Sequence, residues 1–303
     1  MPEGTKKEKG SIWLYLLIAN IFTWVLWIPS LLIANINNFS LPTINNYTML
    51  MREGFTSNFH LVLSIFFSLA VYGPFLAAFI VVRMQKGKNG FSHYLATVFK
   101  WKIRARWYLI AFALALCIAL LPFMIGILSR TLNLSINHFT TGLTLFIPIF
   151  LIQVLTSGLG EEPGWRGFLL PALRKIHNKD TAVWLVGIAW AVWHFPFTIF
   201  EVLSNTSNLG TPALIVTILS SLAGQTISLI GMSFIYTWLV TSAKSTFLAI
   251  IFHALTNTLP VVLIGQIPPS LSFIVGFSPW VMVFFLQRIL GKENFPFGSK
   301  NNN

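Results

Sequence analysis

Long apolar runs are the feature of this sequence that most restricts its fold. A membrane-spanning helix needs about 20 consecutive, predominantly apolar residues. Only 9% of the 303 residues are charged, whereas a soluble domain carries about 25%. We therefore predict an all-α integral membrane protein with about eight transmembrane helices, at residues 11–35, 58–82, 107–129, 143–173, 181–200, 212–240, 246–265 and 270–289.

The distribution of basic residues predicts the orientation of these helices. The chain has 20 Lys and Arg and a net charge of +12. With the spans above, all of these residues except Arg52 and Arg130 fall on one side of the membrane. Since loops rich in Lys and Arg stay in the cytoplasm, both termini are predicted to be cytoplasmic in a multi-pass protein of the cell membrane. The membrane explains the positive charge, so we predict no nucleic-acid partner.

The most basic segment, residues 83–106, allows two interpretations. Its aromatic side chains alternate with Lys and Arg, as on an interfacial helix that lies on anionic lipid. A loop that sets the orientation accounts for the same charges, and we favour the loop. The chain then divides into an N-terminal three-span region, 1–142, that contains this loop, a helical core, 143–290, and a polar tail, 291–303.

Ionisable residues inside membrane spans are costly, and each is therefore a candidate functional residue. One group is Glu161, Glu162 and Arg166, and the others are His194 and the pair His253 and Asn257. The remaining histidines fall at span ends or in loops, where we expect ordinary solvated side chains: His60, His93, His138 and His177. The only cysteine, Cys117, excludes a disulfide framework and a cysteine zinc site.

Helix geometry predicts that these groups lie at similar depths. With a rise of about 1.5 Å per residue, Glu161 lies ~20 Å before the basic turn 174–180, and His194 lies ~21 Å after it. The seventh span enters from Lys244 and carries Asn257 to a depth of ~20 Å. Three helices should therefore bring a carboxylate, two imidazoles and an amide together. Because the motif helices are joined on the basic side, we expect access to the site from that side.

Local spacing predicts the roles of these residues. Glu162 and Arg166 are four residues apart and face each other on a helix, whereas Glu161 points about 100° away and is left free. His253 and Asn257 offer two hydrogen-bond donors on one face. A desolvated carboxylate beside an imidazole can act as general base on a water, and nearby donors can stabilise an oxyanion. The chemistry indicated is hydrolysis of an acyl bond by activated water.

Three other interpretations stay open at this point. The polar groups could hold helices together in a non-catalytic protein that binds a peptide or lipid partner. Glu161 and the two histidines could bind zinc, although the sequence has no His-Glu-x-x-His helix. A transporter is disfavoured because the chain has no matching halves.

The three motifs together resemble the CPBP intramembrane protease family, which includes the type II CAAX prenyl endopeptidases and the Abi bacteriocin-processing or immunity proteins. They are Glu-Glu-x-x-x-Arg at 161–166, an aromatic-x-x-x-His at 190–194 and His-x-x-x-Asn at 253–257. The resemblance implies a glutamate-dependent endopeptidase without a catalytic metal or other cofactor. Its partners would be membrane lipid and a peptide or protein substrate, with or without a lipid group.

The resemblance also implies a role for each motif residue. Glu161 would activate the water with the help of His194, and His253 and Asn257 would form the oxyanion site. Glu162 and Arg166 would brace the site. Trp190 stands where the second motif commonly begins with Phe, and we expect this difference to alter packing more than chemistry. Pro163 and Gly164 make the helical pairing of Glu162 with Arg166 the least secure of these assignments.

Overall fold

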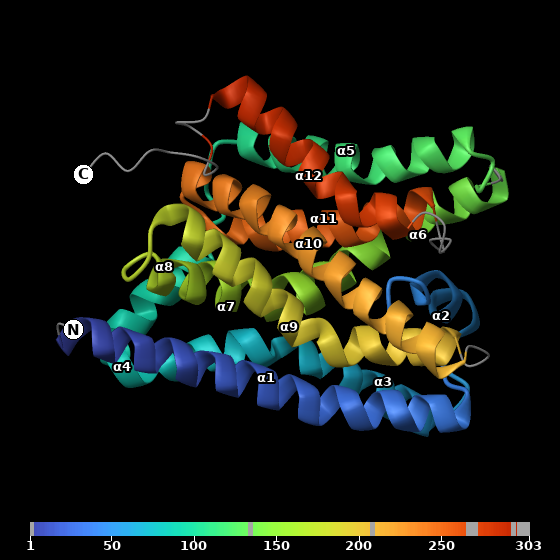
Figure 1. Cartoon of the computed structure of the whole chain (residues 1–303), viewed down its shortest axis with the longest axis horizontal. Coiled ribbons are helices and arrows are strands. Elements are labelled where there is room, and N and C mark those ends of the chain that lie inside the picture. The colour runs from blue at the N-terminus through green and yellow to red at the C-terminus, as the bar shows by residue number, and fades with distance from the viewer. Residues whose placement is uncertain (1–2, 133–135, 207–209, 265–271, 292–294, 296–303) are drawn as a thin grey trace.

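The computed structural model describes residues 3–132, 136–206, 210–264, 272–291 and 295, and the regular structure in these ranges is helical (Figure 1). Among the described residues, seven helical stretches are long and apolar enough to cross a membrane. This confirms an all-α, multi-pass membrane protein. The eighth predicted span corresponds to a shorter apolar helix, Ile274–Leu290.

Twelve α-helices are described. They are α1 (Glu3–Asn37), α2 (Tyr47–Glu53), α3 (Asn58–Leu69), α4 (Gly73–Val98), α5 (Arg106–Leu128), α6 (Ile136–Gln153), α7 (Leu159–Gly164), α8 (Leu170–Leu173), α9 (Lys179–Asn205), α10 (Thr211–Ala243), α11 (Thr246–Leu263) and α12 (Ser272–Leu290). A 3-10 turn at Ala70–Tyr72 joins α3 to α4, and π-helical turns at Val154–Gly158 and Trp165–Leu169 flank α7. The predicted spans 58–82 and 143–173 are therefore each built from several short helical segments.

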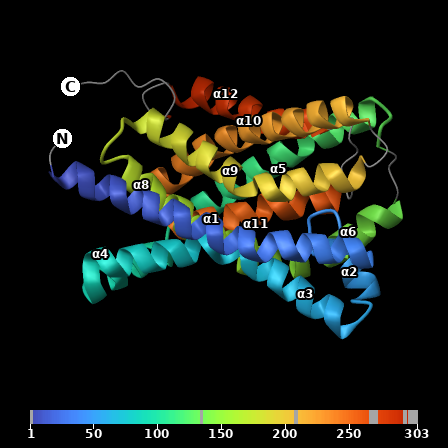
Figure 2. The same ribbon diagram turned by 60° about the horizontal axis from the view of Figure 1, so that its bottom comes forward.

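The long helices lie side by side along the longest axis of the molecule (Figure 1). The N-terminus and α8 lie at one end of this axis and α2 lies at the other, as the second view also shows (Figure 2). In the interior, α9 packs along α10, and α11 packs against α5 and α6. Large apolar side chains remain exposed on the outside, among them Trp13, Ile36, Leu109 and Leu128. So much exposed apolar surface is suited to lipid rather than to water.

The structure corrects our interpretation of residues 83–106 as a loop. Helix α4 continues to Val98, with one break at Gly87, whose φ of 61° lies in the left-handed region. Glycine adopts that conformation without the steric penalty of a Cβ atom. The predicted loop is thus a second helical segment, Lys88–Val98, followed by a short connection to α5.

The interpretation of His60 as a solvated side chain is also wrong. This residue is buried in α3, with 2% of its surface exposed. Its Nε2 lies 2.9 Å from the carbonyl oxygen of Ser40, so the histidine ties α3 to the connection that follows α1. His93 and His177 are exposed as predicted, and the side chain of His138 lies outside the described residues.

Glycine allows α7 to approach the start of α4 closely. A Cβ atom on Gly164 would lie 2.5 Å from the backbone of Pro74, a separation that real Cβ atoms do not adopt. We expect Gly164→Ala to destabilise the protein by about 1–3 kcal/mol through overpacking, measured as a lower melting temperature in detergent. The control is Gly224→Ala in α10, where a Cβ atom would meet open space. Equal melting temperatures for the two variants would contradict this account of the packing.

Candidate active site

Glu162, Arg166 and His253 form a buried polar network between α7, the π-helical turn after it and α11. Arg166 Nη1 donates a hydrogen bond to Glu162 Oε1 at 3.0 Å, and His253 Nδ1 lies 2.8 Å from the same oxygen. The side chains of Glu162 and Arg166 are fully buried. The predicted pairing of Glu162 with Arg166 is therefore confirmed. It persists although Arg166 lies in a π-helical turn, and His253 joins it from a distant part of the chain.

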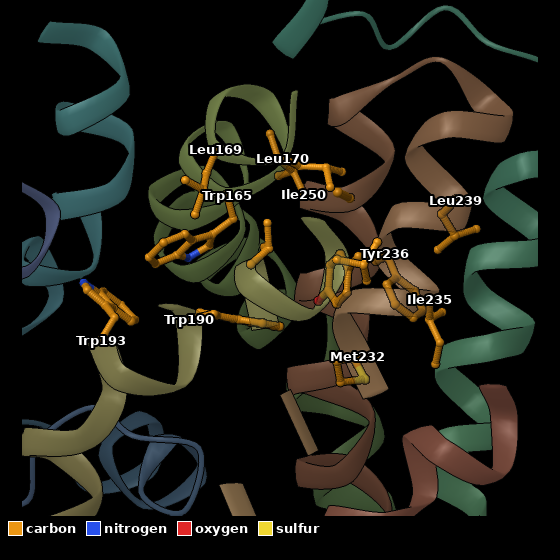
Figure 3. Close-up of a cluster of buried hydrophobic side chains, with 14 of the residues drawn as sticks. Trp165, Leu169, Leu170, Trp190, Trp193, Met232, Ile235, Tyr236, Leu239 and Ile250 are labelled. Atoms are coloured by element: carbon orange, nitrogen blue, oxygen red, sulfur yellow. The ribbon is translucent and has the colours of Figure 1, made fainter. Parts of the chain in front are cut away.

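Two aromatic rings complete the surroundings of Arg166. Its guanidinium carbon lies 4.3 Å from the ring centroid of Trp190 and 4.2 Å from that of Tyr236. Figure 3 shows the Trp190 indole extending toward Tyr236. Arg166 Nε and Nη2 have no hydrogen-bond partner among the described residues. The negative ring faces stabilise the part of this cation that no oxygen contacts.

Glu161 lies beside this network and is 3% exposed. We predicted that it would be free, but Trp190 Nε1 donates a hydrogen bond to Glu161 Oε2 at 2.6 Å. The other oxygen, Oε1, lies 3.9 Å from His253 Nε2. The imidazole closest to Glu161 is thus that of His253, whereas the sequence analysis paired Glu161 with His194. Trp190 thus makes a polar contact with Glu161 in addition to its packing contacts, and a phenylalanine could not donate this hydrogen bond.

His194 and Asn257 lie in the same site and have their own partners. His194 Nδ1 lies 2.9 Å from the carbonyl oxygen of Trp190. A carbonyl only accepts, so Nδ1 carries the proton and Nε2 is left as an acceptor in the neutral ring. Asn257 Nδ2 donates to Gln153 Oε1 at 2.9 Å. The predicted convergence of the three motifs is confirmed, since Glu161, His194, His253 and Asn257 all line one cavity of about 430 Å³.

The cavity extends beyond the motif residues. From Glu161 it continues to the end of α9, the middle of α10 and residues 42–45, which precede α2. Helix α2 lies at the end of the molecule opposite the N-terminus and α8 (Figure 1). The basic residues of 100–106 surround a separate hollow with Lys244. The described lining of the candidate active site thus contains none of the basic residues of the side from which we expected access.

The sequence analysis missed three polar residues of the site. Gln153 is 1% exposed and positions the Asn257 amide. Tyr236 contacts Arg166, and Glu201 lines the cavity beyond His194. All three stand within or directly beside apolar runs, where a polar side chain is a signal of function. That signal was present in the sequence for Gln153 and Glu201. An isolated Tyr in an apolar run is too common to indicate a functional residue.

No group of three or more His, Cys, Asp or Glu among the described residues is arranged to hold a metal ion. Two of the atoms that could bind a metal ion, Glu162 Oε1 and His253 Nδ1, already contact other protein groups. Glu162 Oε1 accepts from Arg166, and His253 Nδ1 faces Glu162.

Residues 143–259 match the model of a protein family described as type II CAAX prenyl endopeptidase Rce1-like. The match covers all three motifs and confirms the resemblance predicted from them. No curated protein matches this chain. At the level of the family, the match supports an intramembrane protease that acts on a peptide or protein substrate.

Proposed function

We propose that this protein is an intramembrane endopeptidase in which Glu161 activates a water molecule for attack on a peptide bond. The observation that carries the proposal is the position of Glu161. Its carboxylate lines the cavity, is fixed by Trp190, and faces the imidazole of His253 across 3.9 Å. That distance is longer than a hydrogen bond, and a water molecule on the cavity side of the two groups could contact both.

Proton transfer is assigned to Glu161 with the assistance of His194. The carboxylate takes a proton from water as the oxygen attacks the carbonyl carbon, and a tetrahedral oxyanion forms. The proton then passes to the departing amide nitrogen as the C–N bond breaks, and the products are a carboxylic acid and an amine. The Nε2 lone pair of His194, which the hydrogen bond at Nδ1 leaves available, supports its role as an acceptor for the second water proton.

His253 and Asn257 are assigned to the oxyanion. Glu162 accepts from His253 Nδ1, which orients the ring with Nε2 on the Glu161 side. In its doubly protonated form this ring donates from both nitrogens. Asn257 has a second amide hydrogen besides the one that Gln153 accepts. Preorganised donors of this kind stabilise the charge that develops in the transition state.

Several finer features belong to the same proposal. We assign the catalytic core to residues 143–290, between an N-terminal region, 1–142, and a polar tail, 291–303. We place the protein in the cell membrane with both termini cytoplasmic, because of the distribution of Lys and Arg. The substrate is a peptide or protein, with or without a lipid group, and neither nucleic acid nor a cofactor takes part.

The first test is cleavage by the purified protein in lipid nanodiscs, detected by mass spectrometry. The substrates are a peptide mixture that contains prenylated and unprenylated C-terminal cysteine motifs. We expect new peptide termini, and their sequences would identify the scissile bond. An absence of products from every peptide would favour the non-catalytic interpretation.

The metal-independent mechanism makes a separate prediction. Incubation with 1,10-phenanthroline or EDTA is expected to leave the rate of cleavage unchanged, because Glu161 and the histidines activate water without a Lewis acid. A thermolysin sample treated in parallel verifies that the chelator is effective. Loss of activity that returns on addition of zinc would support the zinc-protease alternative instead.

A further inference from the structure

Most of the charged side chains that line the candidate active site are carboxylates, and the imidazole of His253 that faces them is balanced by Glu161 and Glu162. The carboxylates of the lining are Glu161 and Glu201, and no Lys or Arg is present among the described residues that line the cavity. The nearest cation, Arg166, is 1% exposed and is already paired with Glu162. A cleft with low-dielectric walls and charge of one sign concentrates ligands of the opposite sign. The lining therefore favours cationic over anionic groups.

Glu201 is the carboxylate of this lining that has no role in the proposed mechanism. It lies in a membrane-spanning helix, α9, and is partly buried. Its carboxylate has no hydrogen bond or ion pair to another described residue, and only its backbone oxygen accepts, from Asn205. An unpaired carboxylate is costly in an apolar helix. Glu201 therefore presents an unpaired carboxylate to a partner that enters the cavity.

A polar residue of α10, Gln225, also lines the cavity. Thr198 Oγ1 donates to Gln225 Oε1 at 2.6 Å, which links α9 to α10 beside Glu201. With Oε1 thus occupied, Gln225 retains an amide NH₂ group that can bind a peptide carbonyl. This part of the cavity can therefore bind an extended polypeptide as well as a charge.

We propose that Glu201 forms a specificity subsite that binds a cationic side chain, Lys or Arg, of the peptide substrate. The inference rests on the proposed protease function and adds the substrate class to it. A free C-terminal carboxylate has no Lys or Arg partner among the described lining residues. The subsite therefore favours cationic peptides over peptides whose main charge is a C-terminal carboxylate.

The position of Glu201 predicts where the cation lies in the substrate. Trp190, which contacts Glu161, precedes Glu201 by eleven residues of α9. This corresponds to ~16 Å along the helix, and an extended peptide covers ~3.3 Å per residue. The Lys or Arg should therefore lie roughly four to six residues from the scissile bond.

The charge preference can be measured without any proteolysis. Cys117 is the only cysteine of the chain, so a Cys117→Ala variant provides a background for Ser228→Cys, a conservative change within the cavity lining. In nanodiscs, this thiol is treated with a trimethylammonium or a sulfonate methanethiosulfonate. Relative to a free thiol, the cationic reagent should react at least about fivefold faster than the anionic one.

Glu201→Gln should reduce this preference at least about threefold, because it removes one unit of charge from the cavity that contains the thiol. The matched control is Glu53→Gln, which removes an exposed carboxylate at the same end of the molecule but outside the cavity. Equal rates for both reagents, a preference that Glu201→Gln does not change, or no labelling at all would overturn the proposal.

A second readout separates this proposal from the protease function. Among the cleavage products of wild type, Lys and Arg should be enriched four to six residues from the cut, and Glu201→Gln should remove this enrichment from the products that it forms. Products without the enrichment would overturn the subsite and leave the protease intact. If no peptide is cut, the protease proposal fails, and the reagent preference still decides whether Glu201 attracts cations.

Discussion

Replacing Glu161 with glutamine is expected to lower the rate of peptide cleavage by about 10²–10⁴-fold, the usual contribution of a general base. Glutamine has nearly the same size and can still accept the hydrogen bond from Trp190 Nε1. It cannot take a proton from water. The rate is measured by mass spectrometry in nanodiscs, with wild type in parallel.

The melting temperature of the same variant provides the control. Because glutamine retains the contact with Trp190, we expect Glu161→Gln to unfold within a few degrees of wild type in detergent. Equal cleavage by the two proteins would exclude Glu161 as the base. A large loss of stability, with no cleavage by either protein, would instead favour the interpretation that the polar cluster holds the helices of a non-catalytic protein together.

The second large effect concerns stability. Glu162→Gln is expected to destabilise the protein by about 3–5 kcal/mol, because removal of one partner from a buried ion pair leaves the other charge uncompensated. Arg166 would keep its contacts with the rings of Trp190 and Tyr236, but it would lose the only carboxylate bonded to it in the described structure. Thermal unfolding in detergent measures the change.

A surface ion pair supplies the matched control for this variant. Lys175 Nζ lies 2.9 Å from Glu8 Oε1, and the lysine side chain is 54% exposed. Glu8→Gln should change stability by no more than about 1 kcal/mol, since solvent screens an exposed pair. The double variant Glu162→Gln/Arg166→Met should recover part of the loss, because no unpaired cation remains. Similar losses for Glu162→Gln and Glu8→Gln would contradict the described burial of the network.

The family match places the polar network in a chemical context that geometry alone does not supply. It covers residues 143–259, which contain all of the groups assigned to water activation and to the oxyanion. Glu201 lies within the same segment, while residues 42–45 of the cavity lining lie outside it. The lining of the candidate active site thus includes parts of the chain that the family comparison does not cover.

Those properties of this protein that depend on short stretches of chain could be predicted from its sequence. Apolar runs of sufficient length must form helices in lipid, because no water is available there to satisfy the backbone. The pairing of Glu162 with Arg166 depends mainly on their separation of four residues along the chain, and it was predicted for that reason. The motif order and the depth arithmetic also predicted that three helices share one polar site.

Other properties were decided only by the tertiary structure. The contact of Trp190 with Glu161, the position of His253 beside both glutamates, and the Gln153–Asn257 hydrogen bond each join helices that are distant in sequence. Their geometry depends on the rotation of each helix about its axis, and the two π-helical turns change that rotation around α7. The burial of His60 and the direction of the cavity depend on how connecting segments fold back over the helices. Hydropathy and spacing describe single helices, so they contain no information about these contacts.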